Sequence, residues 1–418
     1  MATVDFIIRN AGLIATCGGP APKYGAAQGQ ISAVTNGAIA AREGRIVYVG
    51  TEGGLARTFS HTMGAKVVDA GGGTVVPGFV DPHTHLVFAG DRREDLHRRL
   101  AGASHAEITA AGGGIVKTVE ATRKATDADL VALGRARLDE MLAWGTTSCE
   151  AKSGYGLTTD AELRQLRAIK SLRTTQPIEI SPTFMGAHDV PLDFRDKRSA
   201  YLDLVIKEMI PRVAREDLAE WCDVFCETGA FTPEESKAVL MAGIAAGLKP
   251  RIHADEFGDS GGSRVAVEVG ARSADHLVFA TEASAKLLSA KGVIATLLPT
   301  AAFYLKLGRY APARMLIDHN VAVALATDIN PGGGFSPSMP FAMTLACFAM
   351  GLTLEEALVA ATINAACALE RQEDIGSLEM GKQLDAVIIR GTLPDLVRVG
   401  PSVISTVVKK GRVVWPKH

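Results

Sequence analysis

Two histidines one residue apart, His83 and His85, end an apolar run and have the spacing of a metal-binding pair. Alternate residues of a strand point to the same side of a sheet, so both imidazoles can bind one ion. Three further side chains of metal-binding types, His253, His276 and Asp328, also end short apolar runs. Because each lies where a strand-like segment ends, we interpret the five as parts of one site.

Imidazoles and a carboxylate in this combination suit one zinc or iron ion with an open position for water. Such an ion lowers the pKa of bound water from about 16 to about 7, which makes hydroxide available at neutral pH. The expected chemistry is hydrolysis by a metal-activated water. The residue types alone leave zinc and iron both open.

Eight strand-like runs position these residues. Between about residues 79 and 330, short apolar runs alternate with longer amphipathic segments, as in repeated strand–helix units around a parallel sheet. We expect strands at 79–88, 146–152, 179–188, 221–227, 248–255, 273–279, 293–299 and 321–328, with helices that include 161–174, 236–246 and 283–291 between them. Eight such units predict an α/β fold, a TIM-like (β/α)8 barrel, in which catalytic groups lie at the carboxyl ends of the strands.

The two chain ends have a different pattern, in which strands alternate with tight turns. We expect strands at 6–10, 38–50 with a turn at Glu43-Gly44, 385–390 and 405–415. We predict that residues 1–76 plus 376–418 form a small β-sandwich domain and that the barrel, 77–375, is inserted between these two parts. The end segments contain no cluster of catalytic side chains, so we expect the sandwich to cover one side of the barrel and to carry no chemistry.

Composition excludes several classes of partner. The 418 residues carry a formal net charge of −2, which leaves no excess of positive charge to bind nucleic acid or an acidic membrane surface. No apolar run is long enough to span a bilayer, and the N-terminus lacks the basic start and long apolar core of a signal peptide. We therefore expect a cytoplasmic protein that acts on a small molecule, with no nucleic-acid and no membrane partner.

Longer motifs around these residues resemble the amidohydrolase superfamily. The likeness covers essentially the whole chain and is most specific at 85–92, 110–115, 152–157, 253–257 and 327–332. Its leading motif is Pro-Gly-Phe-Val-Asp-Pro-His-Thr-His at the first barrel strand, residues 77–85. The resemblance implies a barrel flanked by a split β-sandwich, one zinc or iron ion per subunit, a homodimer, and hydrolysis of the C–N bond of a cyclic amide.

The resemblance also implies roles for individual residues. The metal ligands would be His83, His85, His253 and Asp328. The substrate contacts would be Arg92, Tyr155, His188, Glu256, Asn330, Gly332 and Gly333. The catalytic residues would be Asp328, Glu256 and His276.

These catalytic roles have a physical rationale. Asp328 can touch the metal and also accept a proton from the water, while Glu256 can pass a proton to the departing ring nitrogen. We expect His276 beside the metal, where it would hydrogen-bond the water or the attacked oxygen rather than bind the ion. The sequence leaves open which of the three moves each proton.

The implied substrate is a cyclic amide with a carboxylate tail. The guanidinium of Arg92 can bind that carboxylate with two parallel hydrogen bonds. Tyr155 and His188 can add single hydrogen bonds. The backbone of 330–333, where glycine allows close approach, can hold the carboxylate that forms when the ring opens. By itself, the charge cluster at 91–95 would indicate solvated surface, and only the resemblance favours substrate binding by Arg92.

Three alternatives stay open. A mononuclear deaminase could use the same metal site, but its neutral base would leave Arg92 without a partner. A binuclear cyclic amidase of the dihydroorotase type would need two metals and a carboxylated Lys152, and the place of this lysine just after the second strand argues against it. A barrel that has lost catalysis and serves as a scaffold would have no use for these buried acidic groups.

Overall fold

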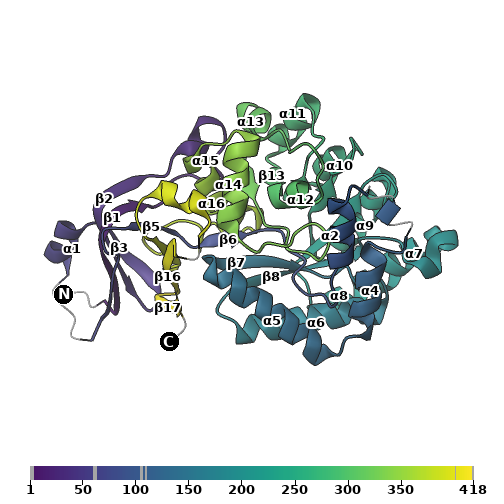
Figure 1. The fold of residues 1–418 in the computed structure, drawn as a ribbon, viewed down its shortest axis with the longest axis horizontal. Helices are drawn as coiled ribbons and strands as arrows, with labels where there is room; N and C mark the ends of the chain where they lie inside the picture. Colours follow the sequence, from purple (N-terminus) through teal and green to yellow (C-terminus); the bar gives the residue numbers. More distant parts are fainter. Residues whose placement is uncertain (1–3, 60–63, 104–106, 109–110, 401, 417–418) are drawn as a thin grey trace.

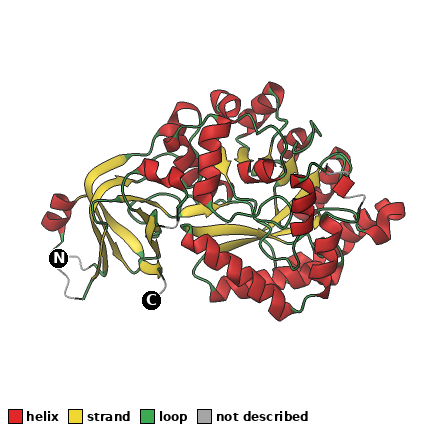
Figure 2. Ribbon diagram, in the orientation of Figure 1, coloured by secondary structure: helices red, strands yellow, loops and turns green. Residues whose placement is uncertain are grey.

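The structure is a computed structural model of the chain, and it describes residues 4–59, 64–103, 107–108, 111–400 and 402–416. Two bodies lie side by side (Figure 1). One is a barrel of strands surrounded by helices, and the other is a smaller body built mostly of strands (Figure 2). The first strand, β1, and the last, β17, both lie in the smaller body.

Eight parallel strands form the barrel in chain order, β6-β7-β8-β9-β11-β12-β13-β14, and a short strand, β10, pairs with β9. Their bounds are β6 Phe79–Asp81, β7 Thr146–Lys152, β8 Glu179–Ala187, β9 Trp221–Cys226, β10 Lys249–Pro250, β11 Ile252–Ala254, β12 Ser273–His276, β13 Ile294–Leu297 and β14 Val323–Leu325. The predicted (β/α)8 barrel and its eight strand-like runs are confirmed.

All the expected strands except the second differ in extent from the structure; the sixth and the eighth, for example, end at His276 and Leu325 instead of residues 279 and 328. The first stops at Asp81 instead of residue 88, because Pro82 lacks the N–H that regular pairing requires. The fifth is interrupted at Arg251, whose N–H still donates to the Cys222 carbonyl (3.0 Å). The segment after Asp81 is therefore irregular backbone, and it carries the two leading histidines.

The barrel closes between its first and last strands through hydrogen bonds that lie beyond the regular pairing. The N–H of Asp328 donates to the carbonyl of His83 (3.2 Å). The N–H of His85 donates to the carbonyl of Ile329 (2.9 Å). This closing seam runs through three of the four predicted metal ligands.

Helices follow the strands and cover the outside of the barrel (Figure 2). Their bounds are α2 Arg93–Leu100, α4 Ile115–Lys124, α5 Asp127–Ala143, α6 Thr159–Thr175, α7 Arg198–Leu204, α8 Ile210–Arg215, α9 Pro233–Ala245, α10 Gly262–Val269, α11 Glu282–Lys291, α12 Pro299–Tyr304, α13 Ala313–Asp318, α14 Met339–Met350, α15 Leu354–Ala360 and α16 Ile363–Ala368. The predicted helices correspond to α6, α9 and α11, which begin after threonine caps at Thr158, Thr232 and Thr281. Within the described residues, no helix combines the length and apolar character needed to cross a membrane.

The strands of both chain ends form one eight-stranded sheet, in the order β17-β16-β15-β5-β1-β2-β3, with β4 paired to β1. Their bounds are β1 Phe6–Ala15, β2 Ala33–Arg42, β3 Arg45–Thr51, β4 Lys66–Asp69, β5 Thr74–Pro77, β15 Ala386–Ile389, β16 Ile404–Lys409 and β17 Arg412–Trp415, and a short helix, α1 (Glu52–Thr58), follows β3. Antiparallel pairing of β5 with β15 joins the two ends of the chain. The sheet folds over its own apolar core, which includes Ile8, Ile39 and Ile388, as expected of the predicted sandwich.

A buried ion cluster joins the sheet to the barrel. Lys409 of β16 is 3% exposed, and its Nζ lies 2.8 Å from Glu179 Oε2 and 2.7 Å from Asp385 Oδ2. Glu179 is the first residue of β8, so this contact lies at the end of the strand opposite the site. Burial acts to raise the pKa of Glu179, but the cations around it, Lys409, Lys410 and Arg371, together outweigh burial and lower the pKa to about 2.

Replacing Lys409 with alanine should destabilise the protein strongly, because the buried Asp385 would lose its cation and Glu179 would keep only the more exposed Lys410 and Arg371. We expect the free energy of unfolding, measured by urea denaturation, to fall by about 3–5 kcal/mol. Because the pKa of Glu179 is lowered, this loss should appear above the ordinary glutamate pKa and shrink as the pH falls towards 2. Lys410 also pairs with Glu179 but is 52% exposed, so K410A should cost below about 1 kcal/mol. Equal losses in the two variants would contradict this account.

Candidate active site

Three imidazoles meet at the carboxyl end of the barrel. One ring nitrogen from each of His83, His85 and His253 lies within 4.8 Å of the others, and the Nε2 atoms of His85 and His253 are 3.2 Å apart. Asp328 Oδ1 lies 3.6 Å from His83 Nε2 and 3.7 Å from His85 Nε2. All four side chains are buried. The structure thus brings the four predicted metal ligands together.

These atoms have the properties expected of metal ligands. Burial lowers the pKa of His83 and of His85 well below the usual histidine value, so both rings are neutral and can offer a lone pair. Burial raises the pKa of Asp328 to about 8, and a cation held beside it would lower this pKa by favouring the carboxylate form that ligation requires. Within the described residues, His83 Nε2 and Asp328 Oδ1 have no hydrogen-bond partner. A cation bound among these atoms would satisfy both, and the donor set suits zinc or iron.

Two aspartates below the site orient two of the histidines. Asp275 Oδ2 lies 2.6 Å from His83 Nδ1, and Asp223 Oδ1 lies 3.0 Å from His253 Nδ1. A carboxylate at Nδ1 fixes the tautomer whose Nε2 is free to bind a metal. Sequence reasoning missed both aspartates. The available signal was a lone acidic residue inside an otherwise uncharged stretch of each buried strand, β9 and β12.

Lys152, the residue that carboxylation would modify in a binuclear enzyme, makes two buried ion pairs. Its Nζ lies 2.9 Å from Glu150 Oε1 and 2.7 Å from Asp223 Oδ2. On the other side, Arg251 Nη2 lies 3.1 Å from Asp275 Oδ2, and all five side chains are fully buried. A carboxylated lysine would place a third anion against Glu150 and Asp223, so this geometry argues against the binuclear alternative.

His276 and Glu256 lie beside the metal ligands. The centroid of the His276 ring is 5.4 Å from that of His83 and 5.2 Å from that of His253. His276 Nδ1 lies 3.5 Å from Glu256 Oε1. Burial, together with the nearby charge of Asp328, raises the pKa of Glu256 well above the usual value. This raised pKa favours the protonated form of Glu256, which a proton donor requires.

The backbone is strained at two of these positions. His276 has a φ of 76° and Asp328 a φ of 51°, in the left-handed region that residues other than glycine rarely adopt. Asn330 Nδ2 donates to the carbonyl of Asp328 (2.8 Å), which supports this conformation. Strain of this kind is typical of functional sites, where the surrounding structure holds a side chain in one direction.

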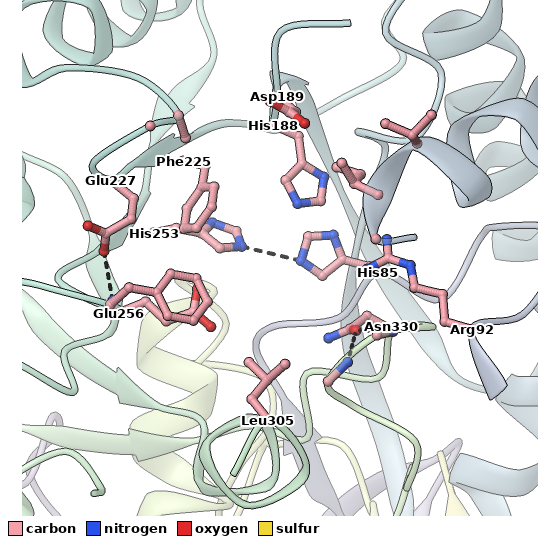
Figure 3. Close-up of a pocket in the computed structure, with 18 of the residues that line it drawn as sticks. His85, Arg92, His188, Asp189, Phe225, Glu227, His253, Glu256, Leu305 and Asn330 are labelled. Carbon is pink, nitrogen blue, oxygen red and sulfur yellow. Dashed lines mark hydrogen bonds between the residues drawn. The ribbon is translucent and has the colours of Figure 1, made fainter. Parts of the chain in front are cut away.

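A pocket of about 840 Å³ opens in front of the histidines. Every predicted site residue except His83 lines it, so the predicted set is brought together: His85, Arg92, Tyr155, His188, His253, Glu256, His276, Asp328, Asn330, Gly332 and Gly333. Figure 3 shows Arg92 on one side of the pocket and Glu256 on the other, with His85 and His253 between them. The pocket can therefore hold a molecule between the guanidinium of Arg92 and the carboxyl group of Glu256.

Arg92 offers a free guanidinium fork to the pocket. Its Nε donates to Thr118 Oγ1 (2.8 Å), and its Cζ lies 6.0 Å from the centroid of the Tyr155 ring. Within the described part of the chain, its two terminal nitrogens make no hydrogen bond or ion pair with another residue. Arginine stays charged even when burial lowers its pKa. The two terminal nitrogens of Arg92 can therefore donate hydrogen bonds to a carboxylate.

Tyr155 and His188 are neutral polar groups in the same wall. Burial lowers the pKa of His188 to about 3, and its Nδ1 lies 3.0 Å from the carbonyl of Gly154. Burial raises the pKa of Tyr155 above the usual tyrosine value, so the phenol keeps its proton. Both side chains can therefore make the single hydrogen bonds expected of them.

The loop at 330–333 corrects one expectation. The amides of Gly332 and Gly333 both donate to Asn330 Oδ1, at 2.8 and 2.7 Å. The amides that we expected to receive a product carboxylate are therefore already paired, and Asn330 shapes the loop instead. A Cβ on Gly332 would overlap Nη1 of Arg92, so glycine is required here for Arg92 to lie against the loop.

Glu227, at the end of β9, supports the turn that carries Glu256. Its Oε2 accepts from the N–H of Phe257 (2.8 Å) and its Oε1 from the N–H of Thr228 (2.8 Å). Figure 3 shows the first of these bonds as a dashed line. The sequence shows Glu227 only as an acidic residue after a strand, and nothing in the spacing indicates its partner.

Comparison with known proteins agrees with this geometry. The model of the amidohydrolase family matches residues 74–414, and the chain belongs to that family. Solved structures of low identity share the fold over 98% of this chain. A triazine hydrolase variant has a TM-score of 0.76 at 18% identity over 94% of its own chain. An adenosine deaminase from Xanthomonas campestris with bound zinc has a TM-score of 0.70 at 19% identity over 92% of its own chain. At these identities the likeness shows the fold alone.

Relatives of much higher identity narrow the assignment within the family. A protein of Symbiobacterium thermophilum is 46% identical over 99% of this chain and 98% of its own length. A protein of Alkaliphilus metalliredigens is 43% identical over 99% of both chains. Both are named imidazolonepropionase, and this chain groups with the imidazolonepropionases.

Replacing Asp275 with asparagine should weaken metal binding by about 10–100-fold, because His83 would lose the charge that orients it. Metal content after titration with a chelator, measured by mass spectrometry, checks this. S273A is the matched control, because Ser273 lies on the same strand and contacts Arg251 (3.2 Å) without contacting a histidine. Equal metal retention in D275N and the wild type would show that Asp275 does not support the site.

Proposed function

We propose that this protein hydrolyses 4-imidazolone-5-propanoate to N-formimidoyl-L-glutamate, a step of histidine degradation. The observation that carries the proposal is one pocket with a metal-type cluster on its floor and a free arginine fork on its wall. The substrate has the matching parts, a cyclic amide and a propionate tail. Near full-length relatives that are named imidazolonepropionase support the same reaction.

We propose that His83, His85, His253 and Asp328 hold one zinc or iron ion. When bound, such an ion lowers the pKa of a water molecule and polarises the amide carbonyl. The chain itself contributes neutral imidazoles, fixed by the two aspartates below them, and a buried carboxylate. The site therefore needs little rearrangement to receive a cation.

The side chains on the pocket wall opposite Glu256 orient the substrate. Arg92 binds the propionate through its two terminal nitrogens, which turns the ring towards the histidines. Tyr155 and His188 add hydrogen bonds to the polar atoms of the ring. This division also separates the proposal from a deaminase of the same family, because the ring of cytosine or guanine carries no carboxylate for Arg92 to bind.

Two carboxyl groups move the protons. Asp328 takes a proton from the attacking water, whose oxygen forms a bond to the ring carbonyl carbon. Glu256 gives its proton to the ring nitrogen as the C–N bond breaks, and His276 donates a hydrogen bond to the attacked oxygen. Glu256 is then a carboxylate and Asp328 carries the proton taken from the water. The new carboxyl group releases its proton as the formimidoyl group, a basic amidine, takes one up. The resulting pair of opposite charges favours the opened ring.

We further propose that the enzyme is a homodimer in the cytoplasm, as the family resemblance implies. We also propose that residues 1–76 plus 376–418 act as a cover for the barrel, 77–375, without a part in the chemistry. The catalytic side chains named above all come from the barrel segment.

Metal-loaded protein should rapidly remove the ultraviolet absorption of freshly prepared imidazolonepropionate. Mass spectrometry should identify N-formimidoyl-L-glutamate as the product. D328A serves as the blank, because it removes both a ligand and the expected base. If the wild type is no faster than this blank, the proposal fails and the deaminase becomes the leading alternative.

Replacing Glu256 with glutamine should lower kcat by about 10²–10⁴-fold, because the amide has no proton to give to the leaving nitrogen. The raised pKa of Glu256 means that the acid form persists above the usual glutamate range. In the wild type, kcat/KM should therefore fall as the pH rises through that raised pKa, and E256Q should lack this alkaline fall. A variant that keeps both kcat and the fall would assign the proton to another residue.

A further inference from the structure

We propose that Thr118 determines the preference of this pocket for a carboxylate tail, because it fixes the orientation of Arg92. The inference rests on the proposed function and deepens the role of Arg92 in it. Thr118 belongs to α4, a helix that carries none of the predicted site residues. Its side chain is 1% exposed, so it acts from behind the pocket wall.

The contact decides which edge of the guanidinium meets the ligand. A guanidinium can bind a carboxylate with two parallel hydrogen bonds through Nη1 and Nη2, or through Nε and one Nη. Arg92 Nε donates to Thr118 Oγ1 (2.8 Å), so the second edge is occupied. The edge formed by the two terminal nitrogens is the one left for a carboxylate.

The loop at 330–333 holds Arg92 from the other side. The missing Cβ of Gly332 lets Nη1 of Arg92 lie against the backbone. Arg99 Nη1 donates to the carbonyl of Gly332 (3.0 Å) and to that of Tyr304 (3.3 Å), which fixes the loop. Arg92 is therefore held between α4 and the loop at 330–333, and its two terminal nitrogens point in one fixed direction.

A guanidinium with a fixed orientation binds a carboxylate at one position relative to the histidines. Figure 3 shows Arg92 facing the same pocket as His85 and His188. An arginine that is already ordered loses little conformational freedom when the ligand binds, so its charge contributes more fully to affinity. Without the threonine oxygen, the guanidinium could rotate, and its buried Nε–H would compete for the ligand or for water.

The test compares two ligands that the enzyme cannot hydrolyse. Imidazole-4-propionate has an aromatic ring and the propionate tail, and 4-propylimidazole has the same ring without the carboxylate. Calorimetry on the metal-loaded protein should give at least tenfold tighter binding of imidazole-4-propionate to the wild type. T118V keeps the side-chain shape but removes the oxygen, so it should lose most of this preference through weaker binding of imidazole-4-propionate alone. T118S keeps the hydroxyl group and should retain the preference.

A matched control lies one turn further along α4. Thr122 is also buried, but its Oγ1 accepts from the N–H of Ala89 (3.1 Å), so T122V should keep the wild-type preference. The inference is overturned if T118V keeps that preference, or if T118V lowers the affinity for both ligands equally. With the substrate itself, T118V should raise KM much more than it lowers kcat.

The two proposals can fail separately. A wild type that prefers imidazole-4-propionate, and loses the preference in T118V, would support the role of Thr118 even if it did not hydrolyse imidazolonepropionate. A wild type that hydrolyses imidazolonepropionate but shows no preference between the two ligands would overturn the role of Thr118 and leave the proposed function in place.

Discussion

The active site depends on a cluster of buried charges beneath it. Glu150, Lys152, Asp223, Arg251 and Asp275 are fully buried, and each is paired with an opposite charge. A buried charge that loses its partner costs about 3–5 kcal/mol, so these groups constrain one another. They come from β7, β9 and β12 and from the link between β10 and β11. The same pairs therefore connect strands of the barrel and hold in place the two aspartates that fix the tautomers of His83 and His253.

The closing seam of the barrel adds a second constraint at the same place. The hydrogen bonds that join the first and last strands pass through the backbone of His83, His85 and Asp328. The positions of these three side chains are thus set by the closure of the fold and not by a flexible loop. This explains how a strained φ at Asp328 is tolerated, because Asp328 and the following residue, Ile329, are both held by backbone hydrogen bonds.

Much of the fold could be predicted because its signals are local. Each barrel strand is a short apolar run that ends in polar residues, and Glu43 and Gly44 adopt the positive φ values, 51° and 77°, of a tight hairpin turn. The contact of Asp275 with His83 joins residues 192 positions apart, and no local pattern marks such a pair. The pairing of Asn330 with its own loop is different. The side chain of asparagine commonly accepts hydrogen bonds from the backbone amides that follow it. A local pattern therefore indicates this pairing.

The pairing of β5 with β15 has a consequence for how the protein is made. During synthesis, β1 to β5 leave the ribosome long before β15, which begins at Ala386. Until then β5 is an unpaired sheet edge, and the partly buried carboxylate of Glu179 lacks its ion pair with Lys409. The nascent chain therefore exposes a β-edge while the whole barrel is being translated, and such an edge can pair with another chain.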